Sequence, residues 1–251
     1  MQILRHLAQR WIAPIADPRA LLSLAFLPRF LTELHRFRKL APQEVVSWSD
    51  TYPCLLDRIR ETPFDPHYFY QGAWLARRLQ EASTSFHVDV GSSVMMVNVL
   101  SAMVKTIFLD YRPLRVSVPH LHPVAGNLTR LPFADASVPS LSCLHVIEHV
   151  GLGRYGDPLD PQGGQLAAEN LQRVVQPGGR LFLSTPVGRE RVCFNAHRVY
   201  RPNTITALFS ALRLESFSLV DDDGRYLERA GLECADGLEY GCGMFEFVKA
   251  K

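Results

Sequence analysis

A short apolar strand that runs into a glycine turn most constrains how this chain can fold. Residues 86–90 predict a buried strand, and Gly91 permits the tight turn that follows it. Ser92 or Ser93 can cap a helix that begins near Val94. A strand that enters a helix through such a turn places backbone N–H groups at one edge of a sheet, which makes this edge a candidate ligand site.

Strands and helices alternate along most of the chain around this turn. The expected helices cover residues 68–82, 94–105, 166–175 and 202–212, and the expected strands cover residues 86–90, 106–109, 141–146, 180–185, 214–220 and 243–248. A Gln-Pro-Gly-Gly turn at 176–179 separates the third helix from the strand after it. This alternation predicts an α/β fold with a doubly wound, mostly parallel sheet.

The composition fits one α/β domain with an extension. The chain has 251 residues, of which 47% are hydrophobic, so it can bury a large core. The formal charge of +2 is too small to indicate a nucleic-acid partner, and we expect none. Five cysteines without a CxxC pair argue against disulfides and against a structural zinc site, so we expect a cytoplasmic protein with no metal.

The N-terminal part is apolar and basic. We expect residues 1–67 to form a helical collar or lid, and residues 68–251 to form the main domain. Apolar residues recur at helical spacing between Leu27 and Phe37, among several arginines, and predict a basic amphipathic helix. We expect this helix to pack on the main domain, and peripheral contact with a membrane surface is the alternative. No apolar run in this region is long enough to span a bilayer.

Asp110 adds a second polar group to the predicted sheet edge. It ends the second strand, 19 residues beyond Gly91, where nucleotide-binding sheets place a carboxylate that accepts both hydroxyls of an adenosine ribose. This spacing does not distinguish a dinucleotide from S-adenosylmethionine. The alternative for Asp110 is a turn residue ahead of Pro113.

Three further motifs, in order along the chain, resemble the class I S-adenosylmethionine-dependent methyltransferases. Segment 126–135 is similar to the motif at the family's third strand, 144–150 to the fourth strand and its exit, and 174–186 to the turn into the fifth strand. The resemblance covers about residues 68–251. It implies the family's Rossmann-like sheet, with the last two strands forming an antiparallel hairpin at the sheet edge.

Two segments resemble a narrower subgroup, the domain of unknown function DUF268. They are 148–157 (Glu-His-Val-Gly-Leu-Gly-Arg-Tyr-Gly-Asp) and 194–200 (Phe-Asn-Ala-His-Arg-Val-Tyr). This resemblance does not supply a substrate.

The family resemblance also implies which residues hold S-adenosylmethionine. The implied residues are Asp89, Gly91, Ser92, Ser93 and His145 near the methionine, Asp110 at the ribose, Tyr111 at the adenine face, and Asn127 and Leu128 at the adenine edge. Many relatives carry Asp where this chain has Asn127. An amide can both donate and accept a hydrogen bond, so N6 of adenine can still be bound.

Methyl transfer is an in-line displacement at a sulfonium, so positioning and water exclusion are the protein's main tasks. A general base is needed only if the acceptor is a hydroxyl or a protonated amine. His145, His149 and His197 are the candidates for that base. We favour His197, in the polar loop after the fifth strand, and we expect His149 to be a hydrogen-bonded structural residue.

The substrate side is expected to include Arg154, Tyr155 and Tyr70. Arg154 and Tyr155 belong to the long glycine-rich loop 151–164, where the arginine can hold a phosphate or carboxylate of the acceptor, or pair with an aspartate of the same loop. Tyr70 either contacts a ligand or packs in an aromatic cluster. The acidic and histidine residues near this loop fit no standard metal-ligand spacing, so we expect a solvated acidic loop at Glu148, His149, Asp157 and Asp160.

The chain departs from the family pattern in two places. Its turn holds one glycine, Gly91, with Ser93 and Met95 where further glycines are usual, so a Cβ can crowd the cofactor. Prolines between Asp110 and Asn127 predict an extended loop instead of a crossover helix. The leading function is S-adenosylmethionine-dependent methyl transfer to a small-molecule or sugar-containing acceptor. The alternatives are a non-catalytic binding module of the same fold and a nucleotide-binding oxidoreductase.

Overall fold

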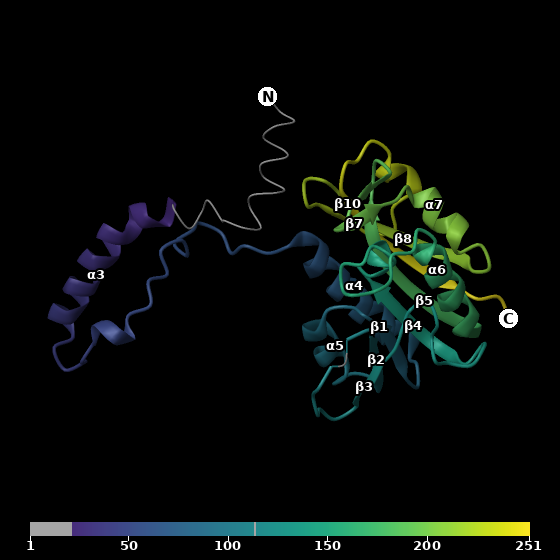
Figure 1. Ribbon diagram of the computed structural model, residues 1–251, viewed down its shortest axis with the longest axis horizontal. Helices are drawn as coiled ribbons and strands as arrows, with labels where there is room; N and C mark the ends of the chain where they lie inside the picture. The colour runs from purple at the N-terminus through teal and green to yellow at the C-terminus, as the bar shows by residue number, and fades with distance from the viewer. Residues whose placement is uncertain (1–21, 113) are drawn as a thin grey trace. The chain divides into compact units, whose positions relative to one another are not determined.

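The computed structural model describes residues 22–112 and 114–251 (Figure 1). The chain divides into two compact units, Met1–Pro63 and Phe64–Lys251. The predictions made for residues 1–21 lie outside the described residues.

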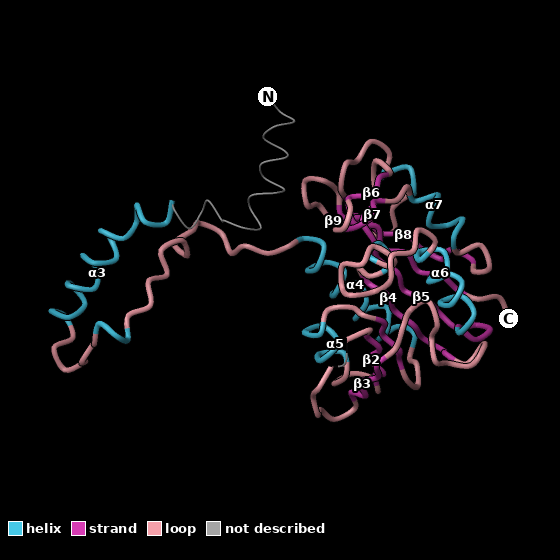
Figure 2. The backbone as a smooth tube through the Cα atoms, in the orientation of Figure 1, coloured by secondary structure: helices cyan, strands magenta, loops and turns pink. Residues whose placement is uncertain are grey.

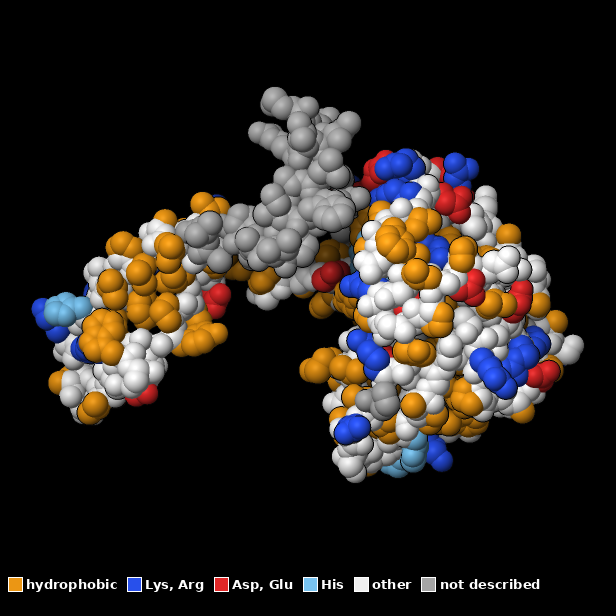
Figure 3. All heavy atoms as spheres, viewed as in Figure 1, with side chains coloured by type: hydrophobic (Ala, Val, Ile, Leu, Met, Phe, Trp, Pro, Cys, Tyr) orange, Lys and Arg blue, Asp and Glu red, His pale blue; other side chains and the backbone are white. Residues whose placement is uncertain are grey.

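The first unit contains the predicted amphipathic helix. Its elements are η1 (Leu24–Phe26), α3 (Leu27–Leu40) and η2 (Trp48–Asp50). Figure 3 shows hydrophobic side chains gathered along the segment that holds α3, and Leu31 and Phe37 of that helix are exposed. Its packing on the main domain and its contact with a membrane surface stay predictions. No helix in the described part of the chain is long and apolar enough to cross a bilayer.

The second unit is built on one eight-stranded sheet with the order β3-β2-β1-β4-β5-β10-β8-β9 (Figures 1 and 2). Its strands are β1 (His87–Val90), β2 (Thr106–Asp110), β3 (Leu121–Ala125), β4 (Val138–Leu144), β5 (Val175–Val187), β8 (Arg213–Val220), β9 (Tyr226–Leu227) and β10 (Gly241–Val248). The pairs among β1 to β5 are parallel, whereas β10 runs antiparallel to both β5 and β8. The doubly wound, mostly parallel sheet and its antiparallel edge hairpin are therefore confirmed.

Helices cover both faces of this sheet because the strands are apolar on both sides. On one face lie α4 (Pro66–Ala82) and α5 (Val94–Leu100), and on the other lie α6 (Gly163–Val174) and α7 (Pro202–Leu208). Trp74 of α4 packs on Phe182 of β5, with ring centroids 5.8 Å apart. Leu171 of α6 lies in the core of the opposite face with Leu183 of the same strand. Alternate residues of β5 thus serve the two cores.

The boundary that was predicted between residues 67 and 68 falls within the first turn of α4. The carboxylate of Asp65 caps this helix by accepting the backbone N–H groups of His67 and Tyr68. The cap fixes the first turn of α4 and therefore the position of His67 within it.

Most elements begin or end a few residues from their predicted bounds, and three of these differences have a clear cause. The helix after β1 ends at Leu100 instead of residue 105, because the chain turns over the next four residues to enter β2. The helix α7 ends at Leu208 instead of residue 212. The turn predicted at 176–179 lies inside β5, where the pairing with β4 shifts register and Gly178 adopts a φ of 75°. The glycine thus permits a bulge instead of ending the strand.

Smaller elements complete the edge where the parallel strands end. They are η3 (Ile147–His149) directly after β4, the two-stranded hairpin of β6 (Arg191–Cys193) and β7 (His197–Val199), and η4 (Leu232–Ala235). The connection from β2 to β3 contains no helix in its described residues, 111, 112 and 114–120, as the prolines predicted. The strand order reverses between β1 and β4, and this arrangement leaves a crevice at the carboxyl ends of the strands.

Candidate functional site

A pocket opens at this reversal point and joins segments that are far apart in the sequence. It is formed by the ends of β1 and β2, the turn after β3, the exit of β4 and the loop that follows η3. Seven residues predicted to bind cofactor or substrate line it: Gly91, Asp110, Tyr111, Asn127, Leu128, His145 and Tyr155. The structure thus brings into one pocket several of the residues to which the resemblance gave roles at the ribose, the adenine and the methionine.

The turn after β1 keeps its glycine for a geometric reason. Gly91 has a φ of 66°, and a Cβ at this position would lie 3.1 Å from Cγ1 of Val146, which also lines the pocket. Ser93 is the N-cap residue of α5 but makes no side-chain capping bond. The hydroxyl of Ser92 instead accepts the N–H of Leu144, so the predicted serine cap is wrong and Ser92 ties the turn to β4.

Asp89 stabilises the turn after β1 by hydrogen bonds and does not line the pocket. Its fully buried carboxylate accepts the N–H of Ser92, 3.1 Å away, and the hydroxyl of Ser142. Burial raises the pKa of Asp89 to about 6, against the lowering effect of these hydrogen bonds. Nε2 of His87 lies 2.8 Å from the same Ser142 hydroxyl, and burial lowers the pKa of His87 to about 3.

Asp110 lines the pocket, and one of its two carboxylate oxygens already accepts a hydrogen bond from the protein. Its Oδ1 accepts the N–H of Arg112 at 2.7 Å, and the guanidinium of Arg112 lies 3.5 Å from the same oxygen. Asp110 therefore both stabilises the turn after β2 and lines the pocket. Tyr111 follows directly, half-exposed at the same wall.

Asn127 is oriented by its own turn. Its Oδ1 accepts both the N–H and the hydroxyl of Thr129, each at 2.9 Å. Its Nδ2 makes no hydrogen bond to any residue in the described part of the chain. Because the carbonyl oxygen is engaged, the side chain offers the pocket a donor.

A buried carboxylate organises the histidines at the exit of β4. Glu148 is 1% exposed, and its Oε1 accepts a hydrogen bond from Nδ1 of His145 at 2.9 Å. Nε2 of His149 lies 3.8 Å from the same oxygen. Burial by itself would lower the pKa of His145, but Cys242 and Glu148 beside it outweigh burial and raise this pKa well above its usual value.

The expectation of a solvated acidic loop is wrong for Glu148 and His149. His149 lines the pocket, and its Nδ1 lies 2.6 Å from the carbonyl oxygen of Ala196, which fixes Nδ1 as the donor. Burial lowers the pKa of His149, which outweighs the opposing effect of Glu148. The neutral imidazole therefore keeps a free electron pair on Nε2.

The loop after η3 forms the outer rim of the pocket. The carboxylate of Asp157 accepts the N–H groups of Gly151 and Tyr155, at 2.8 and 3.2 Å. Two guanidinium groups lie over the ring of Tyr155, with Arg112 at 4.6 Å and Arg154 at 5.1 Å from the ring centroid. The loop is thus an ordered rim.

Arg154 does not pair with an aspartate of its own loop. Its Nη1 donates to the carbonyl oxygen of Ala196 at 3.0 Å, and no carboxylate among the described residues lies within 4.0 Å of its guanidinium. Its positive charge is therefore uncompensated by a neighbouring carboxylate at the rim of the pocket.

Six predicted site residues do not line the pocket: Asp89, Ser92, Ser93, Arg154, His197 and Tyr70. His197 on β7 lies behind His149, with ring centroids 6.5 Å apart, and burial lowers its pKa. Tyr70 stacks on Tyr226, with centroids 5.1 Å apart and ring planes within 9° of each other. Tyr70 thus belongs to an aromatic cluster on the α4 face of the sheet.

Sequence reasoning missed three residues of this edge. Glu148 could have been found, because it follows a buried strand directly and stands between two histidines. His67 and Cys242 lie far from His145 in the sequence, and no spacing signals that the three side chains meet.

Two family models match the chain in this region. The model described as "Methyltransferase domain" matches residues 80–183, and the one described as "Caenorhabditis protein of unknown function, DUF268" matches residues 135–233. The first match holds β1 to β4, and the second holds the loop of Arg154 and the hairpin of His197.

Similar proteins agree with these matches. A Mycolicibacterium smegmatis protein named "Probable S-adenosylmethionine-dependent methyltransferase" is 31% identical over 149 residues, which are 57% of this chain and 49% of that protein. The chain thus spans about half the length of this curated relative. Among solved structures, the N-methyltransferase NodS of Bradyrhizobium japonicum, in complex with S-adenosylhomocysteine, has a TM-score of 0.52 at 15% identity and covers 79% of this chain and 92% of its own.

The [4+2]-cyclase SpnF shares the same fold, with a TM-score of 0.51 at 12% identity, over 70% of this chain and 81% of its own. A cyclase among the neighbours means that the fold does not by itself decide the reaction. The family follows from the two matched models together with the sheet order and the pocket at its reversal point. The matched models and the curated relative together support a class I S-adenosylmethionine-dependent methyltransferase that carries a DUF268 segment at residues 135–233.

Proposed function

We propose that this chain transfers a methyl group from S-adenosylmethionine to a small-molecule or sugar-containing acceptor. The observation that carries the proposal is the pocket in which Gly91, Asp110 and His145 converge at the reversal point of the sheet. These groups fit the cofactor. The turn at Gly91 has no Cβ to occupy the close approach, and Asp110 keeps one carboxylate oxygen without a protein donor among the described residues.

S-adenosylmethionine supplies an electrophilic methyl group on a sulfonium when it is bound. The residues of this chain position it: Asp110 accepts hydrogen bonds from ribose hydroxyls, and Asn127 and Leu128 meet the adenine edge. Gly91 lets the backbone approach the methionine portion closely. Because displacement at the methyl group needs alignment more than acid–base help, holding donor and acceptor in line is the main catalytic contribution.

His149 is the histidine that we assign to the acceptor. It lines the pocket, and its Nε2 carries the free electron pair, because Nδ1 donates to Ala196. When the acceptor is a hydroxyl, this Nε2 takes its proton as the methyl group is transferred. His197, which the sequence favoured as the base, does not line the pocket, and its ring centroid lies 6.5 Å from that of His149, so we assign it the role of positioning His149 instead.

The acceptor class is inferred from the rim. Arg154 offers a guanidinium without a neighbouring carboxylate, and Tyr155 beside it offers an aromatic face. An anionic group, such as a phosphate or carboxylate, suits the first, and a sugar ring suits the second. These features support a polar, small-molecule or sugar-containing acceptor.

The position of Met95 favours an enzyme over a non-catalytic module. A methionine at a glycine position of the turn could have filled the cofactor space, but Met95 is 75% exposed and does not line the pocket. The remaining alternative, a nucleotide-binding oxidoreductase, has no support in the matched family models, which describe a methyltransferase domain.

Calorimetric titration with S-adenosylmethionine and S-adenosylhomocysteine tests the proposal. We expect binding that Asp110→Ala weakens about tenfold or more, which is about 1.4 kcal/mol. Asp223→Ala, which removes an exposed carboxylate outside the pocket, is the matched control and should leave both affinities unchanged. If neither ligand produces heat on titration or a thermal shift, this result contradicts the proposal and favours the binding module.

A second measurement tests the acceptor class. S-adenosylhomocysteine release is followed with a panel of sugars, sugar phosphates and small carboxylic acids. We expect turnover with at least one anionic member and a raised KM for it in Arg154→Gln. An unchanged KM in Arg154→Gln would contradict the role of Arg154 but would not contradict methyl transfer.

A further inference from the structure

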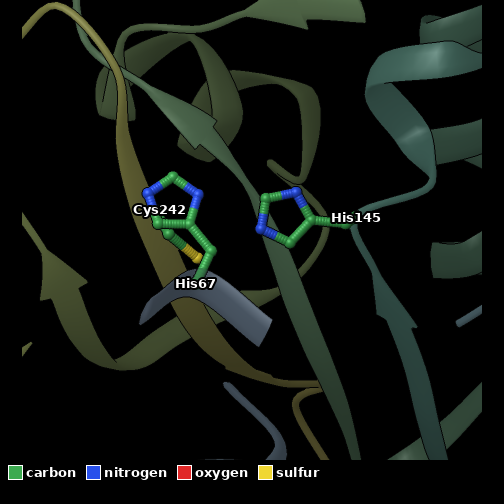
Figure 4. A group of neighbouring side chains, drawn as sticks. All are labelled: His67, His145 and Cys242. Atoms are coloured by element: carbon green, nitrogen blue, oxygen red, sulfur yellow. The ribbon is translucent and has the colours of Figure 1, made fainter. Parts of the chain in front are cut away.

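Three potential metal ligands converge beside the pocket from distant parts of the chain. His67 lies in the first turn of α4, His145 follows β4, and Cys242 lies on β10. One ligand atom from each, a ring nitrogen or the sulfur, lies within 4.8 Å of the other two. Figure 4 shows the two imidazole rings and the sulfur gathered around one small region.

The ring nitrogen Nε2 of His145 has no partner. It is buried and makes no hydrogen bond to a described residue, while Nδ1 of the same ring donates to Glu148. In the neutral ring, the proton on Nδ1 leaves an electron pair on Nε2, which a metal ion can take in place of a second proton. A buried polar atom without a partner is costly unless something binds it, and the cluster lies at this atom.

Glu148 has the geometry of an outer partner for a metal ligand. Metal-binding histidines commonly donate their second ring N–H to a carboxylate, which fixes the tautomer and strengthens the ligand. The 2.9 Å bond from His145 to the 1% exposed carboxylate of Glu148 is such a contact. Thr185 lies at the other oxygen of Glu148, 3.5 Å away, and helps to hold it.

The other two groups are available and well placed. Cys242 is a fully buried free thiol at the start of β10, an interior strand of the sheet. The ring of His67 stacks between those of His145 and Tyr240, with centroids 5.6 and 5.4 Å away, so its orientation is restricted. A restricted ring loses little freedom when it binds a metal.

We propose that His67, His145 and Cys242 bind a zinc ion. Two imidazoles and a thiolate form a ligand set that suits Zn²⁺, which takes four ligands in a tetrahedron. A thiolate at Cys242 and the carboxylate of Glu148 would together balance the two positive charges, so the burial of the ion is compensated. Three protein ligands leave the fourth position for water or an acceptor atom, as in catalytic zinc sites.

Zinc binding as such goes beyond the proposed function and does not depend on it. A role in catalysis does rest on that function: His145 also lines the cofactor pocket, so an oxygen or sulfur of the acceptor held by the ion would lie beside the methyl donor. The ion would favour the deprotonated form of such an atom, which is the nucleophilic form.

Cobalt and zinc titrations of the chelator-treated full chain test the site. We expect one ion per chain and, with Co²⁺, the thiolate charge-transfer band and strong visible bands of a tetrahedral complex. Cys242→Ala should abolish the charge-transfer band, and His67→Gln should weaken Zn²⁺ binding on the order of 100-fold or more. His67 is partly exposed near the start of its helix, so this variant should fold.

Matched controls separate ligation from general effects. Cys143→Ala also removes a fully buried free thiol, on β4, which β5 separates from β10, and His122→Gln removes an exposed histidine on β3. Both should keep the spectrum and the affinity of the natural chain. Cobalt binding without the thiolate band, or Zn²⁺ affinity equal in His67→Gln and His122→Gln, would overturn the proposal.

The same samples are titrated with S-adenosylhomocysteine. Zinc binding without S-adenosylhomocysteine binding would support the metal site and contradict the proposed methyl transfer. The reverse result would overturn the metal site and leave the proposed function standing.

Discussion

Nδ1 of His145 donates a hydrogen bond to Oε1 of Glu148 across 2.9 Å, and this bond decides which nitrogen of His145 faces the cluster with His67 and Cys242. The carboxylate is almost completely buried, and Nε2 of His149 lies 3.8 Å from the same oxygen. One side chain thus links the proposed zinc site to His149, the histidine that we assign to the acceptor.

Glu148→Gln should weaken zinc binding without changing the ligands. The amide keeps the size of the side chain but supplies a weaker acceptor for His145, so we expect a 10–100-fold loss of Zn²⁺ affinity. The cobalt spectrum should keep its thiolate band, because Cys242 is unaffected. Unchanged affinity in competition with a chelator would show that Glu148 does not support a metal ligand.

Gly91→Ala should destabilise the chain more than an alanine at another left-handed glycine. Gly237 also has a positive φ, 82°, but a Cβ there meets nothing within 4 Å, whereas a Cβ at Gly91 lies 3.1 Å from Val146. We expect a loss of about 1–2 kcal/mol in both variants from the backbone conformation. The crowding should add about 1–3 kcal/mol at Gly91.

Urea unfolding measures this difference, and Val146→Ala in the Gly91→Ala background should recover part of it. S-adenosylhomocysteine affinity should fall only in the Gly91 variant, because Val146 lines the pocket. Equal destabilisation by the two alanines would mean that the turn tolerates a Cβ.

Asn127→Asp should tighten the binding of S-adenosylhomocysteine. Since Thr129 engages the carbonyl oxygen of Asn127, the natural side chain presents an amide donor to the pocket. An aspartate keeps the bonds to Thr129 and presents an acceptor to the amino group of adenine, a gain of about tenfold in affinity. Calorimetry measures it, and Asn127→Ala is the control for loss of the side chain. Weaker binding in Asn127→Asp than in the natural chain would mean that the donor is the group that the ligand uses.

Asp89 should make the stability of the chain depend on pH. Its pKa is raised from 3.8 to about 6 in the folded state, so the folded state binds its proton more tightly than the unfolded state does. The stabilisation by this proton is complete below pH 4 and is lost as the pH rises through 6, with a total change of about 3 kcal/mol.

The comparison with Asp89→Asn isolates this effect. The free energy of unfolding of the natural chain minus that of the variant should fall between pH 4 and pH 7 and then stay constant. The variant retains an acceptor for Ser92 and a partner for Ser142, so a pH-independent difference would mean that Asp89 is ionised at no cost in the fold.

Local sequence determined the sheet and half of the pocket. The run of apolar residues before Gly91, and the alternation of strands and helices after it, are short-range signals that survive in the fold because each strand is buried on both faces. The same holds for Asp110 and Asn127, which lie at strand ends, and parallel strands bring their carboxyl ends to one edge. Helix ends were less well predicted, since the end of α5 at Leu100 depends on where the chain must turn to enter β2.

The tertiary structure decided which side chains meet across that edge. Burial turned Glu148 from an expected loop carboxylate into the partner of His145, and the position of α4 over the sheet brought His67 to Cys242. No residue spacing encodes these contacts, because they arise from strand order and from helix packing over long separations in the chain. The sequence by itself therefore determined the fold and the sheet edge where the pocket lies, whereas only the folded chain determined the histidine and cysteine cluster and the orientation of its side chains.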